Sequence, residues 1–322
     1  MNNLLKSNRT NRTLVLAVCG LAFLASSCAR TTPKPDPAAY AREIEQYRAK
    51  RITDLKSETG WLTLIGLFWL KEGANKFGSN PTNDIVLPKQ KVKPFTGVLV
   101  LKDGKVRLEA PVQSGLTIQD TRIRSGVSGD WIVNSIELKS DADGKPTVFN
   151  LGSLTFQIIK RSDKFALRVR DKENPDRANF TGIEVYPPDL KWRIEARFEP
   201  YNPPKPLAIM NVLNMESDET SPGAIRFEVD GKTYRLDAVS EPDEPRLFMI
   251  FADQTNGRET YGAGRYLYVE PPDASGRVVI DFNKSYSPPC AFTNFATCPL
   301  PPDQNRLPLA IHAGEKYRGH SK

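Results

Sequence analysis

The segment Trp192-Arg-Ile-Glu-Ala-Arg-Phe198 alternates apolar and polar side chains along its whole length. Successive side chains of a β-strand point to opposite faces, so this alternation predicts a half-buried strand. Other apolar or alternating runs predict strands over Gly97–Leu101, Val106–Leu108, Leu154–Ile159, Phe165–Val169, Ile225–Val229, Leu247–Phe251, Arg265–Val269 and Val278–Phe282. The chain after residue 60 is therefore predicted to be mainly β.

Short turn sequences separate the predicted strands. Asp-Gly or Asn-Gly pairs, which favour tight hairpin turns, begin at residues 103, 143, 230 and 256. Pro-Pro pairs begin at residues 187, 203, 271, 288 and 301. Because proline cannot donate a hydrogen bond to a β-ladder, these pairs indicate loops and sheet edges.

One helix is predicted before the strands, over residues 37–60. Asp36 and Pro37 form an N-cap followed by proline at the first helical position. Apolar residues at positions 40, 44, 47, 52 and 55 recur near helical spacing within a strongly charged stretch. We expect an amphipathic helix that packs on the β-rich body and ends near Gly60.

The first 28 residues predict export and lipid attachment. Basic residues at positions 6, 9 and 12 precede the apolar run Leu14–Leu24, which fits a signal peptide and is short for a membrane-spanning helix. Small residues at positions 25–27 then precede Cys28, a pattern that suits the lipoprotein signal peptidase. Residues 1–27 are predicted to be removed, Cys28 to be acylated, for example with palmitate, and residues 28–36 to form a tether. The alternative is an ordinary secretory signal that leaves Cys28 unmodified.

The predicted anchor and the charge of the mature chain limit the partners. Acyl chains hold a protein at a membrane, here on the extracytoplasmic side, or on the periplasmic side of the outer membrane in a host with two membranes. The whole chain carries a net charge of +7, and three of these charges lie in residues 1–27, which leaves the mature chain near +4. These charges form no basic cluster with interleaved aromatic residues, so nucleic acid is not an expected partner.

The cysteines fit an exported protein. Cys290 and Cys298 remain after removal of the signal peptide and acylation of Cys28. Outside the cytoplasm such a pair favours a disulfide that closes a tight loop. The alternative is a metal site, for which the mature chain offers only His312 and His320 as imidazole ligands. We expect no metal and no cofactor.

The sequence lacks the motifs of several enzyme classes. The chain has no Gly-x-Ser-x-Gly elbow, His-Glu-x-x-His zinc motif, phosphate-binding glycine-rich loop or dinucleotide fingerprint. If the chain is an enzyme, carboxylate chemistry with Glu259 and Asp281 fits best, as in glycoside or ester hydrolysis.

The first part of the β-rich region resembles a forkhead-associated domain. The resemblance rests on Trp69–Gly78, on Asn83-Asp-Ile-Val-Leu-Pro88 and on Leu151–Phe156. It covers residues 61–172 and implies a β-sandwich of about eleven strands. Ser79 stands where that family has its phosphate-reading arginine, so the resemblance does not imply phosphothreonine binding.

The motifs of the second β-rich region, residues 173–322, closely resemble the bacterial family of domain of unknown function sixteen eighty-four. They are Glu259–Leu267, with the sequence ETYGAGR at its start, Asp281–Tyr286, Pro288–Phe292, Cys298–Pro302, Asn305–Leu307 and Ala313–Lys316. Gly60-Trp-Leu62 near the end of the predicted helix and Arg168-Val-Arg-Asp171 belong to the same resemblance. The resemblance extends from about residue 40 to 317 and implies one module, whose second part is a further sheet or barrel. It implies no activity.

The polar residues of these motifs are the candidate site. We expect them to converge in a pocket at one end of the second β-rich region, where loops commonly carry binding sites. They are Glu259, Tyr261, Arg265, Asp281, Asn283, Tyr286, Asn305, Glu315 and Lys316.

Four interpretations of these motifs remain open. The residues can be architectural, with Arg265 paired to Asp281, or they can bind a small polar or anionic ligand over Arg265 and Lys316. They can also form the carboxylate hydrolase described above, or an envelope scaffold for protein partners that the sequence does not identify. Ligand binding is the preferred hypothesis.

Overall fold

The structure is a computed structural model that describes residues 35–118, 127–128, 131–132, 136–317 and 319. The predicted signal peptide 1–27, Cys28 and most of the predicted tether lie outside these residues. The chain divides into the units Met1–Asp36 and Pro37–Lys322, and the second unit alone is described below. Among the described residues, no helix has the length and apolarity needed to cross a membrane.

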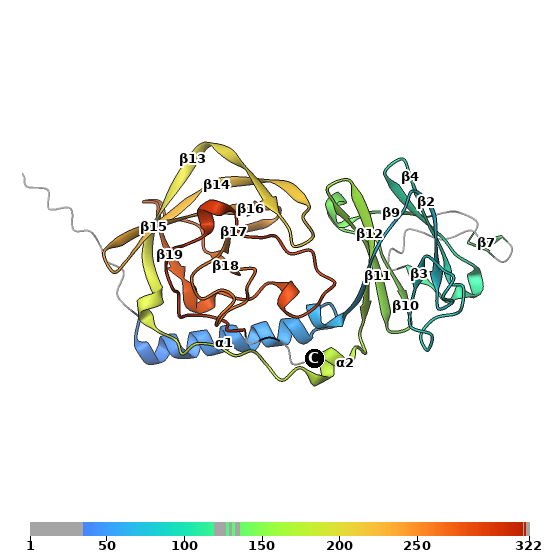
Figure 1. The fold of residues 1–322 in the computed structure, drawn as a ribbon, viewed down its shortest axis with the longest axis horizontal. Helices are drawn as coiled ribbons and strands as arrows, with labels where there is room; N and C mark the ends of the chain where they lie inside the picture. Colours follow the sequence, from blue (N-terminus) through green and yellow to red (C-terminus); the bar gives the residue numbers. More distant parts are fainter. Residues whose placement is uncertain (1–34, 119–126, 129–130, 133–135, 318, 320–322) are drawn as a thin grey trace, which may run out of the picture. The chain divides into compact units, whose positions relative to one another are not determined.

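Helix α1, Pro37–Lys56, opens the second unit and is blue in Figure 1. It buries Tyr40, Ile44 and Leu55, which confirms the amphipathic pattern. The helix ends four residues before Gly60, earlier than predicted, because the chain turns back against the last helical turn. A Cβ atom on Gly60 would lie 2.2 Å from the carbonyl oxygen of Leu55, so this close approach requires glycine.

Two five-stranded sheets form the next part of the fold. The first has the order β1 (Leu64–Trp69), β12 (Lys164–Asp171), β11 (Leu154–Arg161), β10 (Val148–Leu151) and β6 (Thr117–Ile118). The second has the order β3 (Ile85–Val86), β2 (Gly73–Gly78), β4 (Gly97–Lys102), β5 (Lys105–Glu109) and β9 (Ile136–Leu138). A small hairpin, β7 (Val127–Ser128) and β8 (Trp131–Ile132), accompanies them.

The apolar core of this part lies between the two sheets. Phe77 and Leu99 from one sheet pack in one cluster with Phe156 and Leu167 from the other, and all four are fully buried. This arrangement is a β-sandwich, as predicted. Asp103 and Gly104 both have positive φ angles, 51° and 71°, in the turn between β4 and β5, as the Asp-Gly signal predicts.

The remaining strands form two smaller sheets. One has the order β15 (Lys232–Asp237), β14 (Glu216–Val229), β13 (Arg193–Met210) and β19 (Arg277–Asp281). The other has the order β16 (Val239–Glu241), β17 (Glu244–Phe251) and β18 (Arg265–Val269). The segment around Trp192–Phe198 is the start of β13, which confirms that strand. The short helix α2, Pro175–Asn179, precedes them, and the mainly β fold class is confirmed.

Strands β17 and β18 separate two apolar clusters. Met249 and Phe251 point to the core that they share with β14, β15 and β19, whereas Phe248 and Ile250 point to the other face. The C-terminal residues close over this second face, where Tyr266 forms a bridge to Tyr286. Alternation along β17 and β18 therefore places a second set of side chains next to the C-terminal loops.

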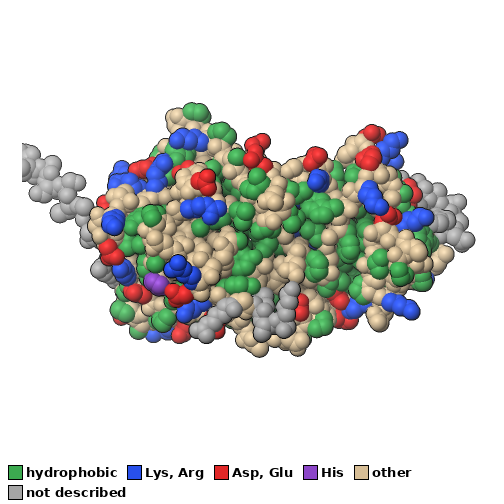
Figure 2. All heavy atoms as spheres, viewed as in Figure 1, with side chains coloured by type: hydrophobic (Ala, Val, Ile, Leu, Met, Phe, Trp, Pro, Cys, Tyr) green, Lys and Arg blue, Asp and Glu red, His purple; other side chains and the backbone are tan. Residues whose placement is uncertain are grey.

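The exposed charges are of mixed sign. On the face shown in Figure 2, Lys and Arg side chains lie among Asp and Glu side chains, and hydrophobic side chains gather in the middle.

Candidate functional site

A cavity of about 640 Å³ lies where α1, the sandwich strands β11 and β12, the strands β16 to β18 and the C-terminal loops meet. This volume is in the range of small-molecule sites. Six aromatic residues line it, namely Tyr47, Trp61, Phe248, Tyr266, Tyr268 and Tyr286. Five basic residues, Lys50, Arg51, Arg161, Arg168 and Arg246, and two acidic residues, Asp54 and Glu241, complete its charged lining.

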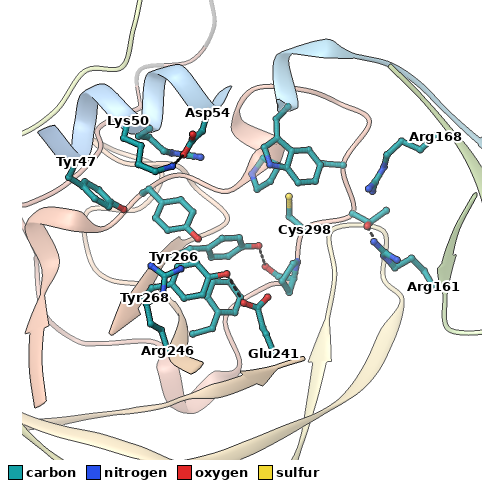
Figure 3. A pocket seen from close by; sticks show the side chains of 18 residues that line it. Tyr47, Lys50, Asp54, Arg161, Arg168, Glu241, Arg246, Tyr266, Tyr268 and Cys298 are labelled. Carbon is teal, nitrogen blue, oxygen red and sulfur yellow. Dashed lines mark hydrogen bonds and ion pairs between the residues drawn. The ribbon is translucent and has the colours of Figure 1, made fainter. Parts of the chain in front are cut away.

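Figure 3 shows how distant parts of the chain contribute to this cavity. Tyr47 and Lys50 come from α1 on one side, and Arg161 and Arg168 come from the sandwich on the other. Cys298, in the C-terminal loop, lies between them.

Strand alternation places Arg168 at the cavity. Leu167 and Val169 of β12 point into the core of the sandwich, so Arg168 and Arg170 point to the opposite face of the sheet. Trp61 covers this face, and its ring lies 5.5 Å from the guanidinium carbon of each arginine. Arg168 is therefore only 5 % exposed, although its position on the strand faces away from the core.

The guanidinium of Arg168 has no hydrogen bond or carboxylate partner within the part of the chain that the structure describes. Its Nε atom is buried and unpartnered there. Burial, followed by the neighbouring charges of Arg161 and Arg170, lowers the pKa of Arg168 to about 10, so the group stays charged at neutral pH. A buried charge without a partner is costly, and a guanidinium group is chemically suited to bind an anion.

The other arginines of the cavity have carboxylate partners. Arg161 donates to Asp141 at 2.8 Å, and its Nε also donates to the hydroxyl of Thr297 at 2.9 Å. Arg51 donates to Glu315 at 3.0 Å, and Arg246 to Glu244 at 2.6 Å. These ion pairs hold their guanidinium groups in place and leave Arg168 as the exception among the four cavity arginines.

The aromatic residues form an ordered wall next to β17 and β18. The guanidinium carbon of Arg51 lies 4.6 Å from the ring centre of Tyr286, and that of Arg246 lies 4.4 Å from the ring centre of Tyr268. The Tyr268 hydroxyl donates to Glu241 at 2.5 Å. The cavity therefore combines apolar ring surface with polar groups at its ends.

The predicted disulfide is not formed in the structure. Cys290 and Cys298 are free thiols, and the backbone N–H of Cys290 donates to the Sγ atom of Cys298 at 3.1 Å. Contact with Cys298 lowers the pKa of Cys290, whereas the pKa of Cys298 is raised by its contact with Cys290 and by burial. The two residues are neighbours in space, as the disulfide prediction requires, but no disulfide joins them.

Arg265 lies in a sealed cluster instead of an open pocket. It is fully buried, and its ion pair is with Asp253 at 2.6 Å, not with Asp281 as the architectural interpretation expected. It also donates to the backbone carbonyls of Ile311, at 3.0 Å, and Ala313. These contacts fix the C-terminal segment against β18.

Asp281 and Asn283 belong to a second buried cluster, and Asn283 also lines a smaller cavity of about 190 Å³ together with Glu315. The buried hydroxyl of Tyr40 on α1 donates to Asp281 at 2.8 Å and accepts from the side-chain amide of Asn283 at 2.8 Å. Burial, followed by the charge of Asp281, raises the pKa of Tyr40, so its hydroxyl stays protonated and can donate. This cluster anchors the helix.

The remaining predicted residues are dispersed. Asn305 bonds backbone groups of Asp237 and Ile250, and Glu315 bonds Arg51 and the backbone N–H of Ser287. Glu259 accepts from the Tyr186 hydroxyl at 2.9 Å, and Lys316 lies over the Tyr186 ring. The ring of Tyr261 meets that of Tyr317 edge to face. Of the nine predicted residues, only Tyr286 lines the large cavity.

Sequence reasoning missed most of the cavity, although part of the signal was present. Tyr266 and Tyr268 stand two residues apart on the predicted strand Arg265–Val269 and so share one face. Arg246 stands two residues before Phe248 but lies just ahead of the predicted strand Leu247–Phe251. Aromatic residues on the face opposite the core indicate that this face is also covered. On the helix, Tyr47 was predicted to belong to the packed apolar face, whereas Arg51 carried no comparable signal, because a charged helix face is usually solvated.

Comparisons with known proteins identify the C-terminal region. Residues 178–316 match the family model described as "Protein of unknown function (DUF1684)". This match begins later than the expected start near residue 40. An uncharacterized protein from Haloarcula marismortui, whose structure was solved by NMR in solution, is 32 % identical in sequence to this chain, with a TM-score of 0.37. The match covers 44 % of this chain and 78 % of the Haloarcula chain. No curated protein matches the chain. Residues 178–316 of this chain belong to the family of unknown function DUF1684.

Proposed function

We propose that the chain is an exported, lipid-anchored protein that binds a small anionic ligand in the cavity at Arg168. The observation that carries the proposal is the buried guanidinium of Arg168, which is charged and unpartnered among the described residues. An anion at this position would supply the missing acceptor, and a planar guanidinium can bind a carboxylate, phosphate or sulfonate through two parallel hydrogen bonds. The proposed ligand site is therefore at Arg168, whereas the sequence had predicted it at Arg265 and Lys316.

The shape and lining of the cavity favour a ligand with an apolar or ring-shaped body. Trp61 lies against Arg168, and Tyr266 and Tyr268 also line the cavity; such rings bury apolar surface well. The volume of about 640 Å³ accommodates a molecule of drug-like size. A ring-bearing acid fits this combination better than a bare inorganic ion.

The two alternative functions have less support. The hydrolase hypothesis needs Glu259 and Asp281 at one site, but Glu259 bonds Tyr186 whereas Asp281 bonds Tyr40. No specific observation among the described residues favours the scaffold hypothesis. Ligand binding is therefore the function that the geometry supports best.

The sequence supports the lipid anchor and the location. The basic start, the apolar run and the small residues before Cys28 are the features of a lipoprotein signal. The proposal places an acylated Cys28 at the membrane and the body outside the cytoplasm, and it includes a disulfide between Cys290 and Cys298. Cells fed a palmitate analogue should label the wild-type protein but not Cys28→Ser, and equal labelling would contradict the anchor.

The ligand proposal is tested with a panel of probes and matched variants. Benzenesulfonate, benzoate and glucuronate, with neutral benzamide and glucose as controls, are added to the wild type, to Arg168→Gln and to Arg107→Gln. Arg107 lies on β5, where its side chain is exposed, so its substitution controls for a lost surface charge. The measured quantity is the melting temperature at each probe concentration.

We expect at least one anion to raise the melting temperature of the wild type and of Arg107→Gln, since a ligand that binds only the folded state stabilises it. Arg168→Gln should weaken that anion about tenfold or more, because a hydrogen bond to a charged group contributes roughly 1.5–3 kcal/mol. Neutral probes should show no dependence on Arg168. If every anion acts equally on the wild type and on Arg168→Gln, the proposal is wrong.

A further inference from the structure

Cys298 lies in the wall of the cavity that contains Arg168, and Cys290 lies next to Cys298. Cys298 lines the cavity and is buried, and Cys290 beside it is partly exposed. Their thiols interact with each other, and the N–H of Cys290 points at the sulfur of Cys298. The pair therefore combines a partly exposed cysteine with a buried cysteine that lines the cavity.

The segment between the cysteines is fixed at both ends. Ala291, next to Cys290, and Ala296, near Cys298, are almost fully buried, at 1 % and 3 % exposure. The backbone carbonyl of Cys298 also accepts from the N–H of Val212 at 3.0 Å. Because both ends are held close together, a bond between the two sulfurs requires little rearrangement of the backbone.

The same segment builds the part of the wall that faces the anion position. Residues 296–299 are consecutive, and all four line the cavity. Thr297 accepts the hydrogen bond from Nε of Arg161, and Arg161 is one of the charges that act on Arg168. Two residues, Thr297 and Arg161, therefore connect Cys298 to Arg168.

We infer that Cys290 and Cys298 form an exchangeable disulfide that increases the affinity of the cavity for its anionic ligand. This inference rests on the proposed function, because it concerns the control of the same site. The disulfide ties the cavity wall to Cys290, which fixes Thr297 and Arg161.

The oxidation is a thiol–disulfide exchange with an external disulfide, either a small molecule such as oxidised glutathione or an oxidoreductase. The thiolate of Cys290 attacks one sulfur of that disulfide, and the other sulfur leaves as a thiolate and takes up a proton. Cys298 then loses its proton and attacks the sulfur of Cys290, which expels the second thiol. Two electrons pass from the cysteines to the external disulfide, and two external thiols are released.

The experiment compares the two redox states of the mature chain. One sample is treated with oxidised glutathione and one with dithiothreitol, and both reagents are removed before measurement, since glutathione is itself an anion. Maleimide labelling and intact mass give the redox state of the pair. Calorimetry then gives the Kd for benzenesulfonate in each state, in the wild type, in the double variant Cys290→Ser/Cys298→Ser and in Arg168→Gln.

We expect the oxidised wild type to bind benzenesulfonate about fivefold more tightly than the reduced wild type, in the range of typical coupling between sites. The double variant should show one Kd, near that of the reduced wild type, after either treatment. Failure of oxidised glutathione to form the disulfide would overturn the inference. Equal Kd values in the two redox states would also overturn the inference. If that binding still depends on Arg168, the proposed function stands. Absence of Arg168-dependent binding in both states would overturn the function and the inference together.

Discussion

Arg265 and Arg168 are both buried on β-strands, and they differ in what their guanidinium groups contact. Arg265 on β18 forms an ion pair with Asp253 and donates to two backbone carbonyls. Arg168 on β12 lies against Trp61 and has no hydrogen-bond partner among the residues that the structure describes. The Nε atom is buried and unpartnered in both residues, but the charge of Arg265 is paired with a carboxylate, whereas Arg168 has no ion pair among the described residues.

The difference shows how architecture and binding separate within one chain. A buried charge is tolerated when its partners are close, and the loss of one partner then leaves the other unsatisfied. A buried charge without a partner is retained at the expense of stability, which is typical of functional sites. Opposite effects of substitution at the two arginines are therefore expected.

The largest effect is expected for Arg265→Met. The substitution removes the ion pair and leaves the carboxylate of Asp253 buried with only Thr255 and the backbone N–H of Ile311 as donors. We expect the free energy of unfolding to fall by about 3–5 kcal/mol, measured by denaturant titration. The double variant Arg265→Met/Asp253→Asn should recover part of this loss. A loss below about 1 kcal/mol would show that Arg265 is not structural.

The next largest loss of stability is expected for a substitution at Gly264, the residue before Arg265. Gly264 has a φ of +103°, and a Cβ atom there would lie 2.5 Å from Pro301 and 2.8 Å from the carbonyl oxygen of Phe251. Gly264→Ala should cost about 2–3 kcal/mol of stability through strain and the clash. Gly262→Ala is the matched control, because a Cβ atom at Gly262 meets nothing closer than 3.7 Å. Equal losses of stability in the two variants would show that the positive φ and the close contacts of Gly264 do not matter.

A smaller effect is expected where α1 is anchored. Tyr40→Phe removes the hydroxyl that donates to Asp281 and accepts from Asn283. The loss should be about 1–2 kcal/mol, since buried polar groups lose a partner. Denaturant titration measures this loss, and hydrogen exchange should show faster opening of α1. Unchanged protection of the helix would argue against the anchor.

The sequence predicted the elements of the fold because their signals are local. Alternation in Trp192–Phe198 and the Asp103-Gly104 turn depend on neighbouring residues, and both were located correctly. The family motifs around residue 265 were also recognised. Their polar residues were expected to meet at one site, but Arg265 and Asp281 are held in separate clusters.

The cavity depends on contacts that no local pattern contains. Arg168 occupies a position that alternation assigns to solvent, but Trp61, more than a hundred residues earlier, packs against it. The helix residue Tyr47 likewise reaches the cavity from the start of the unit. A charged residue on a strand gives no local sign that a distant ring will bury it, so this site required the tertiary structure.

The measurement that tests the central claim most directly is the free energy of unfolding of Arg168→Met in a buffer without added organic anions. Methionine keeps the side-chain bulk against Trp61 and removes the charge. If Arg168 is unpartnered within the protein, the variant should be as stable as the wild type, or more stable by about 1–2 kcal/mol. A loss of more than about 2 kcal/mol, of the kind expected for Arg265→Met, would show that Arg168 is already paired and is not an anion receptor.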